Sequence, residues 1–257
     1  MGVAARIALL LGIAALLWLE RKRPLRKPVE RGAKRLARNL ALGAVTAATV
    51  AGIERPSVTR ASRIAVERGW GLLPKLAVPI PLKTAIALAL MDYTLYWWHM
   101  LLHRVPALWR THQPHHTDRD LDSSTALRFH FTEFLASIPW RCAQIVLIGV
   151  GQRTLSMWQA LTFAEVLFHH SNLRLPRGLE HTLAWIVVTP RLHGIHHSVV
   201  REERDSNFSS GLTIWDRLHG TARFDIGRDE VEIGAREGNQ LQDVTLSKTL
   251  ALPFERT

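Results

Sequence analysis

The chain has 257 residues, with 33 Lys and Arg against 22 Asp and Glu, and 47% of its residues are hydrophobic. The single cysteine, Cys142, excludes a disulfide-stabilised fold and a zinc site built from cysteines. The apolar content argues against a disordered chain, because there is enough hydrophobic surface for a core or for contact with a bilayer. The histidines are the unusual feature: twelve of the thirteen lie between His99 and His197, and ten of these form tight groups.

The net charge of +11 is concentrated in one short segment. Nine basic and two acidic residues fall between Glu20 and Arg38, and this segment joins two apolar runs, Val3 to Leu19 and Leu36 to Ile53. Each run approaches the roughly 20 residues that a helix needs to cross a bilayer. The positive-inside rule places such a loop in the cytoplasm, so the charge indicates membrane topology rather than nucleic acid binding. The first run is expected to be a retained anchor, because its charges mostly follow the apolar stretch.

Three further apolar runs follow, from Leu76 to about Leu102, from Phe134 to Gly151 and from Leu155 to Phe168. The sequence therefore predicts an all-α integral membrane bundle of about four to five spans, followed by a helical cap. With a cytoplasmic basic loop, the alternation of spans brings every histidine group to the cytoplasmic face. The segment from Glu54 to Lys75 carries five basic residues and would lie outside, so it is either interfacial or part of a re-entrant second span.

Eight histidines form three spaced groups. The first is a pair four residues apart on a helical segment, so both rings project from one face. The other two repeat one pattern, in which a histidine is followed by two residues and then by two adjacent histidines. Thr189 and Pro190 predict a helix start before the third group, whereas Pro114 disfavours helix inside the second. The groups are His99 and His103; His112, His115 and His116; and His193, His196 and His197.

This number of imidazoles at one predicted membrane face indicates metal binding. A lone histidine is usually a packed core residue, but eight crowded together without a cation would be costly to desolvate and would repel one another on protonation. A catalytic zinc takes three protein ligands, so eight favour two metals, and a nitrogen-rich pair suits iron that performs oxygen chemistry on a lipid. The alternative is a histidine-rich membrane metal transporter or metal-binding protein, although a transporter would hold its ligands near mid-span.

The three groups, in this order and with apolar spans before and between them, resemble the histidine boxes of the fatty acid hydroxylase superfamily, which includes sterol desaturases and sphingolipid hydroxylases. The resemblance runs from about Asp92 to Thr221. We therefore expect a membrane anchor region with the basic cytoplasmic loop at 1–75, a catalytic domain at 76–225 and a tail at 226–257. Similar flanking pieces are Asp92 to His99, Arg128 to Glu133, His170 to Pro176 and Asn207 to Thr221.

The resemblance implies a non-haem di-iron centre, in which zinc can substitute on overexpression, that uses O2 to hydroxylate or desaturate a lipid C–H bond. It carries over the eight box histidines as metal ligands, His170 as a ninth, and His169, in preference to His130, as a tenth. We expect Asp92, Glu133 and Asn172 to orient metal-bound imidazoles. The spacing of the first box, with three residues between its histidines, resembles that of the sterol desaturase branch.

The expected partners follow from what the resemblance requires. The sequence contains no cytochrome b5 haem motif, no flavin or dinucleotide glycine fingerprint and no cysteine cluster, so electrons must come from an external donor of the cytochrome b5, ferredoxin or flavoprotein type. The other partners are a lipid substrate and the membrane, with no nucleic acid. The Ala- and Arg-rich composition favours a bacterial inner membrane, with the catalytic site on its cytoplasmic face.

Overall fold

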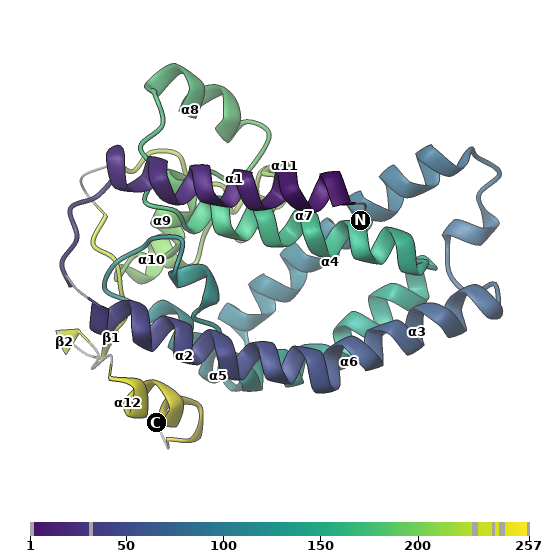
Figure 1. Cartoon of the computed structure of the whole chain (residues 1–257), viewed down its shortest axis with the longest axis horizontal. Coiled ribbons are helices and arrows are strands. Elements are labelled where there is room, and N and C mark those ends of the chain that lie inside the picture. The colour runs from purple at the N-terminus through teal and green to yellow at the C-terminus, as the bar shows by residue number, and fades with distance from the viewer. Residues whose placement is uncertain (1–2, 31–32, 228–230, 238–239, 242–244, 256–257) are drawn as a thin grey trace.

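Five long helical segments lie side by side in the computed structural model, which describes residues 3–30, 33–227, 231–237, 240–241 and 245–255 (Figure 1). Each of the five predicted apolar runs lies in one of these segments, so the prediction of an all-α bundle is confirmed. The segments are α1 (Val3–Lys22); α2 (Ala33–Thr49), continued by the π-helical turn η1 (Val50–Glu54) and α3 (Arg55–Glu67); α4 (Ile80–Arg104); α6 (Phe131–Ile148); and α7 (Gln152–His170).

Shorter elements fill the two ends of the bundle. They are η2 (Leu73–Lys75), α5 (Pro106–His116), η3 (Thr125–Leu127), α8 (Arg177–Ala184), α9 (Pro190–His196), α10 (Arg201–Arg204), α11 (Ile214–Leu218), α12 (Leu246–Ala251) and η4 (Leu252–Phe254), together with the antiparallel pair β1 (Arg236–Glu237) and β2 (Gln240–Leu241).

The order of the long helices brings all the histidine groups to one end of the bundle. The loop between α1 and α2 lies at this end, as do the last turns of α4 and α7 and the short helices α5 and α9 (Figure 1). The opposite end holds the connection from α3 to α4 and the turn from α6 to α7. The basic loop and the histidines therefore share an end.

The outer faces of the long helices carry exposed apolar side chains. By length and composition, one helical stretch in the described part of the chain, Ala33–Lys75, is able to cross a membrane. Large apolar residues are also exposed on the other long helices, among them Leu10 and Leu11 of α1, Ile80 of α4 and Leu147 of α6. A solvated surface of this kind is unfavourable, whereas contact with lipid tails stabilises it.

Two local predictions need correction. The helix that contains the second apolar run does not end near Ile53. It continues through η1 into α3, whose inner face packs on α6. Glu54 lies at this junction, buried and 3.6 Å from the guanidinium of Arg141. Pro114 lies inside α5 rather than breaking it. Only two helical residues follow Pro114, so the helix loses little by its missing N–H, and its carbonyl accepts a bond from Arg128.

The far end of the bundle holds an apolar core that joins α3, α4, α6 and α7. The turn from α6 to α7 depends on Gly149, whose φ of 85° is left-handed. A Cβ at this position would lie 2.7 Å from the carbonyl oxygen of Trp70, so glycine also permits the close approach of the α3–α4 connection. The buried members of this core are Val58, Leu73, Ala87, Met91, Ile145, Ile148, Val150, Leu155 and Trp158.

At the histidine end, α2 is attached to the segment that follows the second histidine box, which ends at His116. Arg35 makes a bidentate ion pair with Asp118, at 2.9 and 2.8 Å, and the side chains of both residues are buried. Asn39, one turn along α2, donates to the same carboxylate and accepts from Arg128, which is itself fully buried. The basic segment of the sequence is therefore partly structural, since Arg35 faces inward.

Candidate metal centre

Nine histidines converge in two groups, within each of which one nitrogen from every ring lies within 4.8 Å of the others. Five of these rings come from the ends of α4, α5 and α9, and the other four from α5, α7 and the end of α9. All nine side chains are buried. The first group is His99, His103, His112, His116 and His196, and the second is His115, His170, His193 and His197.

Helix geometry explains how the second and third boxes each serve both groups, whereas both histidines of the first box join the first group. His112 and His116 lie one turn apart on α5 and face the first group, while the adjacent His115 faces the second. In the third box, His196 joins the first group and His193 joins the second. The predicted start of α9 is confirmed, because the Thr189 side chain caps it and Pro190 takes the first position.

The second group is a chain of imidazoles whose nitrogens face one another. The Nε2 atom of His193 lies 3.0 Å from Nε2 of His170 and 3.1 Å from Nε2 of His197, and His170 is in turn 3.0 Å from His115. A metal about 2.0–2.1 Å from each nitrogen would hold neighbouring ligand nitrogens roughly 3.0–3.4 Å apart. The spacing of the rings therefore fits a shared cation.

Unpaired ring nitrogens in the first group support the same conclusion. Nε2 of His196 and both ring nitrogens of His103 are buried and form no hydrogen bond within the described part of the chain. The nearest charge to His103 is Asp205, 3.5 Å from its Nδ1. Buried polar atoms without partners are costly, and a bound metal would satisfy Nε2 of His196 and one of the two nitrogens of His103.

The irregular segment after α10, in which Asn207 has a left-handed φ of 50°, orients three of the rings through alternate backbone carbonyls. The carbonyl of Ser206 lies 2.8 Å from Nδ1 of His196, that of Phe208 2.7 Å from His99, and that of Ser210 3.1 Å from His169. A carbonyl can only accept, so each Nδ1 carries the proton and each Nε2 keeps its lone pair. In this tautomer each of the three neutral rings presents the lone pair of its Nε2 to a metal.

Two other contacts orient rings in the same way. The carboxylate of Glu133 accepts from Nδ1 of His112 at 3.0 Å, and the backbone carbonyl of Val166 accepts from Nδ1 of His170 at 2.8 Å. Both acceptors leave the opposite nitrogen of the ring directed toward its group. Of the three residues expected to orient imidazoles, Glu133 is therefore the one in direct contact with a ring.

Asp92 and Asn172 instead fasten the loops that surround the histidines. Asp92 accepts from the backbone N–H of Leu212 and the indole of Trp215, which holds the turn after the carbonyl segment. Asn172 bonds both the N–H and the C=O of Arg26, which ties the loop after α1 to the end of α7. Both sets of bonds are to loop residues rather than to an imidazole, so each residue supports the rings only through the loops around them.

The structure separates the two candidates for a tenth ligand. The ring of His169 lies against that of His193, with centroids 4.0 Å apart, although His169 is not a member of either group. His130 caps α6 and contacts Thr132, Phe131 and Phe254. His169 is therefore at the edge of the second group, and His130 lies outside both.

The surroundings of the two groups keep the rings neutral. Burial lowers the pKa of histidines on α5 and α9 well below the usual range, and repulsion between neighbouring rings lowers it further. Aromatic side chains complete the enclosure: Phe129 stacks on His115 with centroids 4.2 Å apart, and Trp109 lies against His103. The histidines with lowered pKa are His115, His116, His193, His196 and His197.

His219 lies outside the groups and packs as an aromatic residue. Its ring stacks on Tyr93 and Tyr96, with centroid distances of 5.7 and 5.1 Å, and meets Trp97 edge-on. The hydroxyl of Tyr93 is 3.2 Å from its Nε2.

Sequence reasoning missed the backbone carbonyls that orient the rings, although it singled out Asp216, which holds their segment, as a residue that could support the metal ligands. Asp216 accepts from the N–H groups of Phe208 and Ser209, at 2.7 and 3.0 Å, and so fixes the carbonyl of Phe208 against His99. A carbonyl is common to every residue and leaves no mark in a sequence. The signal that was available is the similarity of Asn207 to Thr221 to the family, which covers part of this segment.

Comparison with known proteins agrees with this geometry. Residues 84–221, more than half of the chain, match the fatty acid hydroxylase family. The chain belongs to this family. It is 34% identical over 143 residues to the ornithine lipid hydroxylase of Rhizobium tropici, 28% over 144 residues to human alkylglycerol monooxygenase, and 30% over 152 residues to a cholesterol 25-hydroxylase-like protein of Danio rerio.

These matches cover only part of each relative. They span 56, 56 and 55% of this chain, in the order given, but 42, 31 and 55% of the relatives' own lengths. No solved structure was found to match the chain. The matched segment nevertheless contains all nine histidines of the two groups, so the similarity applies to the metal centre itself.

Proposed function

We propose that the protein is a membrane-bound, O2-dependent oxidoreductase that hydroxylates a lipid C–H bond at a centre of two irons. The observation that carries the proposal is the convergence of nine buried histidines in two adjacent groups within the family segment. Because the relatives reported above are named as hydroxylases or a monooxygenase, we favour hydroxylation over desaturation. Bound iron would activate dioxygen and supply the oxidising power for the reaction.

We assign the histidines to two metal positions. The five-histidine group would hold one iron and the four-histidine group the other, with His169 as the additional ligand beside His193. Zinc suits the same imidazoles and can replace iron on overexpression. The role of the chain is then to hold the rings in place, and the carbonyls of Ser206, Phe208 and Ser210 and the carboxylate of Glu133 do this from behind for four of them.

The reaction balances with a separate electron donor. The substrate C–H bond and O2, together with two electrons and two protons, give an alcohol and water. The chain carries no redox group besides the proposed metals, so a cytochrome b5, ferredoxin or flavoprotein would supply the electrons at the histidine end. Enclosure by Phe129, Trp109 and Phe208 would exclude bulk water from the centre.

The exposed apolar helices and the position of the basic loop support a membrane location. We infer that the long helices α1, α2 with α3, α4, α6 and α7 lie in the bilayer, and that the histidine end faces the cytoplasm of a bacterial inner membrane. A lipid substrate would then reach the centre from the membrane. The rival function, metal transport, has less support, because the histidines are enclosed at one end rather than distributed along the helices.

The test is metal content and oxygen dependence of the purified full chain with a membrane lipid extract and a chemical or ferredoxin reductant. We expect about two irons per chain and a hydroxylated lipid that forms only with O2 and takes its oxygen atom from 18O2. His197→Ala, in the second group, should lose iron and activity, whereas His181→Ala, an exposed histidine on α8, should retain both. An iron-free protein that turns over lipid under argon, or one that carries metal across vesicles, would contradict the proposal.

A further inference from the structure

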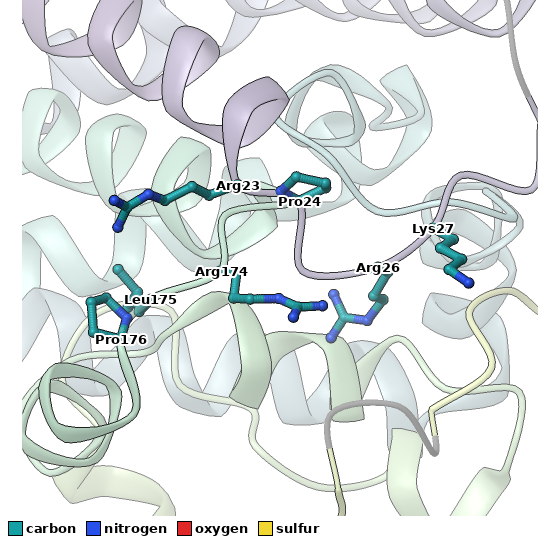
Figure 2. A pocket seen from close by; sticks show the side chains of 7 residues that line it. All are labelled: Arg23, Pro24, Arg26, Lys27, Arg174, Leu175 and Pro176. Atoms are coloured by element: carbon teal, nitrogen blue, oxygen red, sulfur yellow. The ribbon is translucent and has the colours of Figure 1, made fainter.

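A cavity of about 590 Å³ lies directly after the last turn of α1, beside the metal centre. Four of its seven lining residues are cationic, namely Arg23, Arg26, Lys27 and Arg174, and none is acidic (Figure 2). Its volume is in the usual range for small-molecule sites. The other lining residues are Pro24, Leu175 and Pro176.

Backbone pairing builds the cavity from two distant segments. The N–H of Leu25 donates to the carbonyl of Asn172, and the N–H of Arg174 donates to the carbonyl of Arg23, both at 2.8 Å. The guanidinium of Arg174 also donates to the carbonyl of Leu25 at 3.2 Å. These bonds fix the backbone that carries the cationic residues, together with the side chain of Arg174, so the charge does not belong to a free loop.

Arg26 is the unusual member of the set. Its guanidinium reaches under α9, where a Cβ on Gly194 would overlap it, and Nη2 donates to the carbonyl of Pro190 at 3.4 Å. Its Nε and Nη1 atoms are closed to solvent and have no hydrogen-bond partner within the described residues. The carboxylate that acts electrostatically on Arg26 is Glu180. It already accepts a hydrogen bond from the Thr189 hydroxyl and lies 3.4 Å from the guanidinium of Arg191.

The arrangement of the guanidinium groups also calls for an anion. The side chains of Arg26 and Arg174 point toward one another in Figure 2, with no acidic side chain between them in the lining. Like charges placed in this way repel one another, and the repulsion is relieved when an anion binds between them. The planar N–H fork of arginine matches the oxygens of phosphate and carboxylate groups.

A second cavity, of about 540 Å³, shares Arg26, Lys27 and Arg174 and continues toward Arg119 and Asp120. Its lining includes two acids, and the carboxylate of Asp120 is taken up by the N–H groups of Val29 and Glu30. Of the two cavities, the first is therefore the one whose lining holds no acidic residue.

We propose that this cavity binds the phosphate or carboxylate headgroup of an anionic membrane lipid. Its position favours a lipid over a soluble anion: it opens immediately after α1, whose Leu10, Leu11 and Trp18 are exposed and would run alongside acyl chains. Its lining of only seven residues favours a headgroup over an acidic protein partner, which would need a larger surface. Because Arg26 lies against Gly194, between His193 and Ile195, the bound headgroup sits next to the third histidine box.

The experiment measures binding of dioctanoyl phosphatidylglycerol and dioctanoyl phosphatidylcholine to the purified full chain in neutral detergent. We expect one saturable site for phosphatidylglycerol and a dissociation constant at least about ten-fold weaker for phosphatidylcholine, because charge-assisted hydrogen bonds distinguish them. Arg26→Gln combined with Arg174→Gln should weaken phosphatidylglycerol binding about ten-fold or more. The exposed pair Arg60→Gln with Arg63→Gln on α3, with the same change of charge, should bind as the natural chain does.

Because Arg26 packs against the third box, its replacement could also disturb the histidines. A second double variant that leaves Arg26 in place is therefore included. Arg23→Gln with Lys27→Gln changes only exposed lining residues. It should weaken the binding of phosphatidylglycerol while leaving the metal content unchanged. Equal affinity for both lipids, unchanged binding in both lining variants, or an equal loss in the α3 control would overturn the proposal. So would inorganic phosphate that binds as tightly as the lipid, or a plant-type ferredoxin whose binding is lost in these variants while that of the lipid is kept.

Discussion

In each oriented imidazole of the candidate centre, Nδ1 donates a hydrogen bond that fixes the ring, and Nε2 remains free to bind a metal. Glu133 differs from the other acceptors because it carries a charge, and it contacts His112 at 3.0 Å in a buried position. A carboxylate behind an imidazole makes the ring more basic and fixes its tautomer. The identity of residue 133 should therefore influence how tightly the five-histidine group holds its metal.

Glu133→Gln preserves the size of the side chain and a carbonyl acceptor but removes the charge. We expect metal affinity or turnover to fall about 10- to 100-fold, since contacts of this kind usually have effects of that size. Metal per chain by mass spectrometry and turnover with a lipid extract measure the change. Glu202→Gln, an exposed acid on α10, is the control and should match the natural chain. If both variants match it, Glu133 has no role in holding His112.

At the residue scale the sequence revealed side chains but not their backbone partners. The histidine groups stood out because imidazole spacing repeats along the chain. The division of the second and third boxes between two groups did not, because it depends on how α5 and α9 are placed against α4 and α7. Nor could the carbonyls of Ser206, Phe208 and Ser210 be found, since every residue has one and only the path of the chain selects these three.

At the scale of helices, apolar runs located all five long segments and misjudged one end. The helix that begins at Ala33 continues to Glu67, although α3 is rich in arginine. Hydropathy cannot detect such a continuation, because the inner face of α3 packs on α6 while its charged face remains exposed. The basic segment was also more than a topology signal, because the ion pair of Arg35 with Asp118 joins α2 to the segment after the second box.

This ion pair gives a prediction about how α2 is attached. Arg35→Met leaves the fully buried carboxylate of Asp118 without its cation, and breaking a buried pair usually costs about 3–5 kcal/mol. We expect a loss of that size in the free energy of unfolding in detergent micelles. Arg63→Met, on the exposed face of the same continuous helix, should cost less than about 0.5 kcal/mol. Adding Asp118→Leu to Arg35→Met should recover part of the loss, and equal effects of the two single variants would rule out this attachment.

The whole molecule should lose stability in acid because of its crowded imidazoles. Five rings on α5 and α9 have a folded-state pKa well below the usual 6.5. Below pH 6.5 the unfolded chain binds protons that the folded chain does not, so the free energy of unfolding falls as the pH falls. Each such ring contributes about 1.4 kcal/mol per pH unit once the pH is well below 6.5.

We therefore expect the melting temperature to be nearly constant between pH 7 and 8 and to drop steeply from about pH 6.5 to 5. Differential scanning fluorimetry in detergent measures it, with and without chelator, because protons and metal compete for the same nitrogens. His181→Gln removes an exposed histidine on α8 and should leave the profile unchanged. A melting temperature that stays constant or rises down to pH 5 would contradict the burial of neutral rings.

The arrangement of the long helices also predicts which end of the molecule faces the cytoplasm. The continuous helix from Ala33 to Glu67 is about 50 Å long at 1.5 Å per residue, enough for a bilayer with its headgroup regions. Its two ends should therefore lie on opposite sides, with the basic loop inside. In a Cys142→Ser background, a membrane-impermeant maleimide added to intact bacterial spheroplasts should label Arg68→Cys, and should label Arg21→Cys only after permeabilisation. The reverse pattern would invert the orientation, and labelling of both sites in intact cells would mean that α2 and α3 do not span the membrane.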